Sequence, residues 1–373
     1  MSQGGHLTGI PKRVGLIGLS AKGSWASRSH LGYFQRTDLY KITALQNSSE
    51  ASAEAAAKEY KLDGVATYDS PSKIACDLNV DIIAVSVNVP EHYDLIRPAL
   101  EAGKDVFSEW PLARNLSEAE ELVQLAKSKG VRTMVGLQAR QNPSILKAKE
   151  IVASGKLGKI LGTTLYGHGG IFGPIAYESF LYGYPIEAGA NLVTIPFGHA
   201  IDALCYVLGE IKDISATLAN HRPDLDLLGS DGKPKSKVQK TAHDYVSITA
   251  RLANGGGVVD ATYAPEQSRT GRDFYWEING TEASLVLEGG KGHGFVQMWQ
   301  PTIKLATDDK VEEVEVEQAP DLSFNVGKAW DAWAGIGTEN GHSVTTFEDA
   351  LLRHKMIDAV YRSAERGTRE SYL

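Results

Sequence analysis

Apolar segments alternate with amphipathic segments through the first third of the chain. Short apolar runs predict buried strands, and the segments between them predict helices. The run at 81–87 is apolar almost throughout, as is typical of a strand covered on both faces. This alternation predicts an α/β fold, a doubly wound parallel sheet whose ligand lies at the carboxyl ends of its strands. Strands are expected at 13–18, 40–45, 81–87, 105–110 and 131–137, and helices at 50–60, 90–103 and 117–130, the last opened by a Ser117–Glu120 capping box.

Beyond Leu161 the apolar residues recur at every second position, which predicts strands. Segments 245–252 and 258–263 flank a glycine-rich turn at 253–257, which is a hairpin signal. We expect an α+β domain with an open, mostly antiparallel sheet, one face on a helix and the other on a partner subunit. Further strands are expected at 274–279 and 284–287, an edge strand at 311–317, a polar surface loop at 224–240 and a last helix at 346–366.

The length of 373 residues favours two domains, which the pattern places at 1–142 and 143–373. The net charge of −8 argues against direct nucleic-acid binding, which needs a basic face. No run of 18 apolar residues predicts a membrane span. Cys76 and Cys205 lie among apolar residues, so we expect buried free thiols, a reducing compartment and a cytoplasmic protein. We expect no metal site.

A glycine turn follows the first predicted strand. Gly18 and Gly23 stand where the first and third glycines of a dinucleotide fingerprint stand, and Ser20 replaces the middle one. Gly18 permits the tight turn, Gly23 lets helix approach strand, and the N–H groups before Trp25 face a pyrophosphate. Alone, such a turn is often only a turn. Together with the alternating pattern it predicts a Rossmann domain that binds a nicotinamide dinucleotide.

The end of the second strand distinguishes the cofactors. NAD needs an acidic residue there, whereas this chain offers Gln46, Asn47, Ser48 and Ser49. Neutral donors accept a 2′-phosphate that a carboxylate would repel, which favours NADP and leaves NAD possible. The alternative is that Ser48 and Ser49 only cap the next helix.

Polar residues at the ends of the remaining strands complete the predicted cofactor site. Such residues meet at one edge of a parallel sheet, where the ligand binds. The candidates are Asn88, His92, Glu109, Trp110, Gln138 and Arg140.

The second domain offers candidates for proton transfer. A helix beginning near Pro196 would place His199 and Asp202 on one face, and a histidine exchanges protons near neutral pH. The alternative is a structural histidine held by Asp202 between the domains. Tyr166, Tyr182 and Tyr184 lie among glycines upstream, which suits a sugar-like ligand or an ordinary loop.

Taken together, these residues resemble the Gfo/Idh/MocA oxidoreductase family along nearly the whole chain. The resemblance implies NAD(P)-dependent oxidation or reduction of a sugar or other small hydroxy or carbonyl metabolite. In the family, a Glu-Lys-Pro lysine and an Asp-x-x-x-His pair serve the proton transfer. The matching positions are Gly18 to Gly23, His92, Glu109 and Pro111, Arg140 and Pro143, and Gly198, His199 and Asp202.

Two positions depart from the family pattern, because Trp110 replaces the lysine and Ile195 the aspartate. The chain is more similar still to the fungal branch that contains the galactose-pathway repressor, which also has Glu-Trp at the lysine site. That repressor binds a dinucleotide, dimerises and binds an activator protein.

Two hypotheses follow. In the first, which we favour, the chain is an enzyme in which His199 or one of Tyr166, Tyr182 and Tyr184 protonates the substrate while Trp110 packs on nicotinamide or substrate. The alternative is a non-catalytic regulator with a protein partner, which could be nuclear. A homodimer is expected in both cases.

Overall fold

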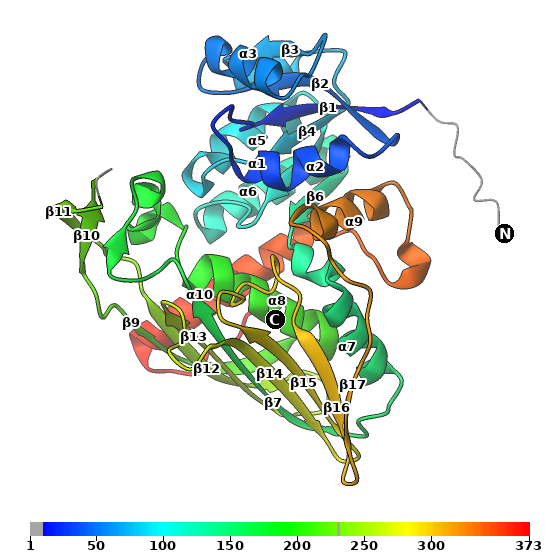
Figure 1. Cartoon of the computed structure of the whole chain (residues 1–373), viewed down its shortest axis with the longest axis vertical. Coiled ribbons are helices and arrows are strands. Elements are labelled where there is room, and N and C mark those ends of the chain that lie inside the picture. Colours follow the sequence, from blue (N-terminus) through cyan, green and yellow to red (C-terminus); the bar gives the residue numbers. More distant parts are fainter. Residues whose placement is uncertain (1–9, 230–231) are drawn as a thin grey trace.

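Two sheets organise the chain, one in each half of the molecule (Figure 1). The computed structural model describes residues 10–229 and 232–373. The strands of the first sheet end at Gly136 and those of the second begin at Ile160, on either side of the predicted division after residue 142.

The first sheet has six strands in the order β3-β2-β1-β4-β5-β6, and every pairing within it is parallel. The order reverses direction between β1 and β4, and ligands of such sheets bind outside the carboxyl ends at that point. The predicted parallel sheet is confirmed, with one further strand, β3, that the sequence did not predict. Its strands are β1 Lys12–Ile17, β2 Tyr40–Gln46, β3 Ala66–Tyr68, β4 Ile82–Val85, β5 Asp105–Glu109 and β6 Thr133–Gly136.

Helices cover both faces of this sheet. The predicted helix at 117–130 is present as α6, Leu116–Lys129, but its predicted cap is wrong. Asn115 is the N-cap, and its side chain accepts a hydrogen bond from the Glu118 N–H at 3.0 Å. Asparagine is as good a cap as serine, so the N-cap lies two residues earlier than expected. The others are α1 Trp25–Arg28, α2 His30–Phe34, α3 Glu50–Glu59, α4 Pro71–Ala75 and α5 His92–Glu101.

The second sheet has eight strands in the order β17-β16-β15-β14-β7-β13-β12-β9. Only β7 and β13 pair in parallel, so the predicted, mostly antiparallel sheet is confirmed. The hairpin expected around 253–257 joins β12 to β13, and β17 is an edge strand as predicted. Its strands are β7 Ile160–Gly169, β9 Ile211–Ala219, β12 Tyr245–Leu252, β13 Val258–Pro265, β14 Arg272–Gly280, β15 Ser284–Gly290, β16 Thr302–Ala306 and β17 Val311–Glu313.

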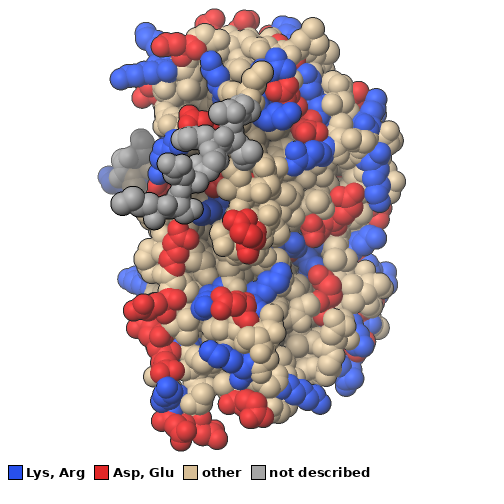
Figure 2. Space-filling model, turned by 90° about the vertical axis from the view of Figure 1, so that its right-hand side faces the viewer, with Lys and Arg blue, Asp and Glu red and all other residues tan. Residues whose placement is uncertain are grey.

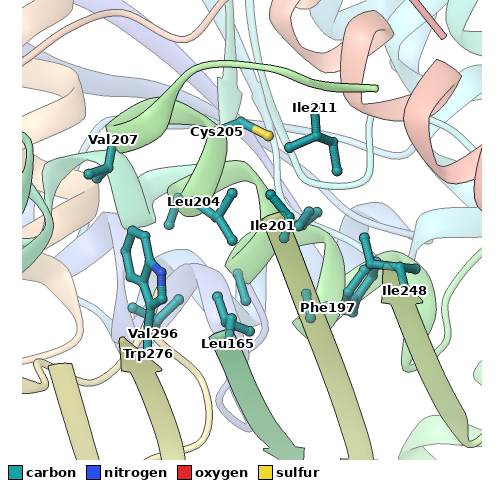
Figure 3. Packing of buried hydrophobic residues seen from close by; sticks show 14 of the residues in the cluster. Leu165, Phe197, Ile201, Leu204, Cys205, Val207, Ile211, Ile248, Trp276 and Val296 are labelled. Atoms are coloured by element: carbon teal, nitrogen blue, oxygen red, sulfur yellow. The ribbon is translucent and has the colours of Figure 1, made fainter. Parts of the chain in front are cut away.

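Helices α7 Pro143–Ala153, α8 Gly198–Leu208 and α10 Phe347–Arg366 lie over one face of the second sheet (Figure 1). Figure 3 shows Ile201 and Leu204 of α8 pointing toward Leu165 and Trp276 of the sheet. The helical stretch Ile186–Leu208 is long and apolar enough to cross a membrane by length and composition alone. Its residues are mostly buried in this core, which is where a central helix of a folded domain belongs.

A third, small sheet of three strands corrects the prediction of a surface loop at 224–240. Strands β10 Asp224–Leu228 and β11 Pro234–Gln239 form a hairpin beside β8, Ile175–Ala176. Leu225 and Leu227 point inward against Ala176 and Tyr184, so apolar alternation, hidden among polar neighbours, makes this segment a strand. Residues 230 and 231 of the expected loop lie outside the described residues.

Helix α9, Ser323–Trp333, belongs to the second half of the sequence but packs on the first sheet. Its buried face lies against α2 and the strands below it, and Figure 1 shows it (orange) between the two halves.

Of the two cysteines, Cys205 is buried as expected, whereas Cys76 is exposed, which corrects that expectation. The exposed position arises because Cys76 caps the short helix α4 at the surface.

Candidate functional site

The glycine turn after β1 lies at the carboxyl end of the first sheet. Gly18 has φ +98°, and a Cβ there would overlap the carbonyl oxygen of Ser86, which follows β4. Only glycine satisfies both demands. Gly23 has φ +89°, but a Cβ added there would meet no atom within 4 Å. Its role is therefore the backbone angle and not the predicted contact between helix and strand.

The helix after this turn differs from a long dinucleotide-binding helix. It is split into α1 and α2 at Ser29, and its first piece has only four residues. The Trp25 indole N–H donates to Glu109 Oε1 at 2.8 Å, so Trp25 links the turn to β5. Ser20 also fixes the turn, because its Oγ accepts from the Lys22 N–H at 3.2 Å.

The neutral segment after β2 divides into structural and open positions. The Asn47 amide donates to the Leu19 carbonyl at 2.8 Å and to the Ser52 carbonyl at 3.1 Å, which ties the glycine turn to α3. Ser49 caps α3 by accepting from the Ser52 N–H at 3.2 Å, as the alternative interpretation expected. Ser48 is not the cap, and it is exposed.

Glu109 lies at the end of β5, between α2 and β6. His30 Nε2 lies 2.6 Å from Oε1, the same oxygen that Trp25 contacts. A Cβ on Gly136 would overlap the other oxygen, so the glycine leaves room for the carboxylate. Glu109 is 8% exposed, which places it at the floor of the site.

Trp110 is held by the protein itself, and its contact with a nicotinamide stays a prediction. Its indole N–H donates to the Thr194 carbonyl at 2.7 Å, and its ring lies against Gly198 and 4.9 Å from the His354 ring. It is 5% exposed. The indole therefore fills the seam between β5 and helices α8 and α10, because a flat apolar ring with one N–H suits a buried site with one carbonyl acceptor.

His92 is held by two backbone carbonyl groups, and its place at the cofactor stays a prediction. Its two ring nitrogens lie 2.8 Å from the Pro111 carbonyl and 3.2 Å from the Val87 carbonyl, and the ring is fully buried. It joins the loops after β4 and β5. Asn88, in the first of these loops, is exposed and stays a candidate for ligand contact.

Arg140 is neutralised by protein carboxylates, and its assignment to the cofactor stays a prediction. Its guanidinium binds both oxygens of Asp202, at 2.9 and 2.7 Å, and lies 3.2 Å from Asp349. Arg353 approaches the same Asp202 at 3.4 Å. Asp202 is thus the partner of two arginines and not of His199.

Three of the predicted proton donors, His199, Tyr166 and Tyr182, lie in different places. His199 is 4% exposed, and burial lowers its pKa to about 3, so the ring is neutral. Tyr166 lies between the inward-facing Leu165 and Gly167, on the sheet face opposite α8, and does not reach His199. Tyr182 packs edge-on against Phe180 and is near Glu91, beside the carboxyl end of β4.

Several buried polar atoms at this edge lack a hydrogen-bond partner within the described residues. They are Ser86 Oγ after β4, Gln138 Oε1 after β6 and His199 Nδ1 at the start of α8. Buried polar atoms cost free energy unless they are paired, so each of these atoms is a position that a bound ligand would satisfy. With Gly18 and the open Ser48, these residues fit a nicotinamide dinucleotide. Among residues 10–229 and 232–373, no cluster of metal-binding side chains occurs.

Acidification is expected to destabilise the fold through His199 and His354. Burial lowers the pKa of each to about 3, against 6.5 for an exposed histidine. Below pH 6.5 both histidines become protonated in the unfolded chain but stay neutral in the folded chain, so the free energy of unfolding falls as the pH falls. The loss is about 2 kcal/mol per histidine at pH 5. Urea unfolding at pH 7.5 and pH 5 measures it.

The variant His354→Phe serves as the control for this pH dependence. It removes the contribution of His354, so the difference in unfolding free energy between the two pH values should shrink by about 2 kcal/mol. An unchanged difference would show that His354 is not buried as a neutral ring.

Comparison with known proteins decides the family. Residues 12–137 match the model of the oxidoreductase family with an NAD-binding Rossmann fold, and residues 143–289 match that of the Gal80p C-terminal domain. A dehydrogenase of Aspergillus oryzae, aclE, is 33% identical over 96% of this chain and 98% of its own length. The chain belongs to the Gfo/Idh/MocA oxidoreductase family.

Within this family, regulators stand beside enzymes. The galactose/lactose metabolism regulatory protein GAL80 of Saccharomyces cerevisiae is 32% identical over 96% of this chain and 94% of its own length. A crystal structure of a super-repressor mutant of Gal80p from the same yeast matches 97% of this chain and 98% of its own chain with a TM-score of 0.89 at 27% identity. The family is therefore certain from the sequence, whereas the role within it is a matter for proposal.

Sequence patterns missed part of this site. Ser86 directly follows an apolar run and could have been found by its place at a strand end. The contact of His30 with Trp330 joins residues 300 positions apart, so no local sequence pattern predicts it.

Proposed function

We propose that this protein is a NAD(P)-dependent oxidoreductase that acts on a sugar or other small hydroxy or carbonyl metabolite. The observation that carries the proposal is the set of unpaired polar atoms at the carboxyl edge of the first sheet, beside a turn that only Gly18 can form. A regulator needs the same cofactor site, but the proposal also draws on the full-length similarity to a dehydrogenase.

The chain's own residues would bind and orient the reactants. Gly18 and Ser20 would admit the pyrophosphate, Gln138 would supply an amide near the nicotinamide end, and Tyr182 would line the substrate side. When bound, the dinucleotide supplies the hydride acceptor or donor. Trp110 would keep the two domains at a fixed angle and exclude water from the seam.

Nicotinamide absorbance tests this function. Protein shown to bind NADPH or NADH is mixed with sugars and small carbonyl metabolites, and appearance or loss of the reduced band is followed. Turnover of one compound with saturable kinetics supports the proposal. A flat trace across the panel at saturating cofactor counts against it.

We propose NADP as the preferred cofactor, because the open Ser48 leaves room for a 2′-phosphate and no carboxylate follows β2 until Glu50. Ser48→Asp should weaken NADPH binding about tenfold through like-charge repulsion of about 1.4 kcal/mol. NADH binding should change less than about threefold, since its ribose hydroxyls accept a carboxylate. Protein fluorescence titration gives both dissociation constants.

Ser48→Asn is the matched control, because it adds the same bulk without the charge. Equal loss of NADPH affinity in the asparagine and aspartate variants would contradict the electrostatic explanation and with it the preference for NADP.

The second candidate is a dinucleotide-sensing regulator without turnover. The burial of Trp110 favours it, because the position of the family's lysine is filled by a ring that cannot transfer a proton. A protein partner, nuclear location and cofactor-dependent association would then be expected. Association of a partner that is independent of both cofactor forms would contradict this candidate.

We also propose a homodimer formed through the sheet face opposite α8, which carries Tyr166. The charged surface in Figure 2 mixes acidic and basic side chains, so that view gives no basic face for nucleic acid. Sedimentation velocity measures whether the protein forms this homodimer in solution.

A further inference from the structure

The two oxygens of the Glu109 carboxylate have different surroundings. Oε1 lies 2.8 Å from the Trp25 indole nitrogen and 2.6 Å from His30 Nε2. Oε2 accepts no hydrogen bond from the part of the chain that the structure describes. It lies beside Gly136, where any side chain would overlap it. One oxygen is therefore fixed by the protein and the other is left for a ligand.

The hydrogen bonds also determine the tautomer of His30. The Trp330 indole donates to His30 Nδ1 at 3.1 Å. An indole N–H only donates, so Nδ1 carries the lone pair and the ring proton is on Nε2, which donates to Glu109. His30 is fully buried and its ring meets Phe107 edge-on at 4.8 Å, so the imidazole cannot turn.

The other candidates for proton transfer are poorly suited to it. Trp110 has no ionisable group, and its N–H is used by Thr194. Burial lowers the pKa of His199 and of His354 to about 3, so neither accepts a proton near neutral pH. Burial, together with the smaller effect of the neighbouring Glu91 anion, raises the pKa of Tyr182 to about 12.

We propose that Glu109 Oε2 is the proton acceptor of this site, with His30 and Trp330 as positioning residues. The inference rests on the proposed function and names its missing acid–base group. In the oxidising direction the substrate O–H bond breaks and its proton passes to Oε2. The C–H bond breaks with its electron pair leaving as hydride to the dinucleotide, and C=O forms. In reduction the protonated Glu109 returns the proton.

Glu109→Gln tests the proposal, because glutamine keeps the shape and removes the proton acceptor. Turnover should fall about 10²–10⁴-fold, the usual effect of losing a general base. The dissociation constant of the dinucleotide should change less than about threefold, which shows that the variant is folded. Glu101→Gln, the same change at an exposed position near the end of α5, should leave turnover within about twofold.

A spectroscopic measurement separates proton transfer from a structural role. In protein labelled with ¹³C at glutamate carboxyls and saturated with dinucleotide, the signal missing from Glu109→Gln belongs to Glu109. Its titration midpoint should coincide with the midpoint of the pH–rate profile. Different midpoints overturn the proposal.

The positioning residues have their own test. In Trp330→Phe the imidazole loses the donor that fixes it, so ¹⁵N spectra should change from one protonated Nε2 to a mixture of tautomers, and turnover should fall about tenfold. A single unchanged tautomer in this variant overturns the role of Trp330.

The outcomes distinguish failure of the proposed function from failure of the assignment of Glu109. Absence of turnover in the unmodified protein refutes the proposed function, and the assignment of Glu109 falls with it. Turnover in the unmodified protein together with Glu109→Gln within threefold of it refutes only the assignment of Glu109.

Discussion

Replacing Trp110 by lysine is expected to lower the free energy of unfolding by about 3–5 kcal/mol and not to create a family-type active site. The indole is 5% exposed, and its N–H is bonded to the Thr194 carbonyl. A lysine would leave a void where the ring packs on Gly198 and would bury an ammonium beside the neutral His354. No carboxylate is among the contacts that the structure gives to Trp110, so the charge would stay unpaired.

Urea unfolding at pH 7.5 measures this effect, and Trp110→Phe is the control. Phenylalanine keeps most of the apolar contact and loses the N–H, so we expect a loss of about 1–2 kcal/mol, because it leaves one buried carbonyl unpaired. A lysine variant as stable as the phenylalanine variant would show that the seam admits water, contrary to the burial of the ring.

The consequence concerns function as much as stability. In this chain the lysine position belongs to the packing between the two domains, so activity must come from other groups or be absent. The assignment of proton transfer to Glu109 is compatible with this packing, because Glu109 lies on the opposite side of β5 from Trp110, against α2 and not α8.

Replacing Asp202 by asparagine is expected to cost about 3–5 kcal/mol, because breaking a buried ion pair leaves its partner charge uncompensated. Asp202 is fully buried and is approached by Arg140 at 2.7 Å and by Arg353 at 3.4 Å. Asparagine keeps one acceptor oxygen for these guanidinium groups, replaces the other with a donor NH2 and carries no charge. The effect should appear in the urea midpoint with an unchanged denaturant slope, since the surface exposed on unfolding is the same.

The pair of Arg97 with Glu101 provides the control. Their side chains meet at 3.0 Å on α5 and are 54% and 50% exposed. Glu101→Gln should therefore change stability by less than about 0.5 kcal/mol, as surface pairs do. Equal losses in the two variants would contradict the argument that burial decides the cost.

Much of the architecture followed from the pattern of apolar residues. A buried strand must be apolar and short, and a covered helix must repeat its apolar residues at 3.6-residue spacing, so local composition reports the environment directly. The parallel sheet, the hairpin at 253–257 and the final helix were predicted for this reason. The small sheet with Leu225 and Leu227 was not, because two apolar residues among polar neighbours give too weak a signal.

Chemistry at the site was harder to predict, since a residue type does not state its partners. Arg140 and His92 were expected near the cofactor, but each is used within the protein, by Asp202 and by the Pro111 carbonyl. Trp110 and His199 were recognised as unusual positions, yet their burial and neutrality depend on helices that arrive from elsewhere in the chain.

By itself, the sequence determined a parallel sheet followed by a mostly antiparallel sheet, a glycine turn at Gly18 and the family, because these depend on local spacing and on backbone angles that favour glycine. Only the tertiary structure decided that Trp110 is a buried wedge, that Asp202 serves two arginines and that Glu109 is oriented through His30 by Trp330. The physical reason is that hydrogen bonds and burial are set by contacts between distant segments, and α9 returns to the first sheet from 300 residues beyond His30.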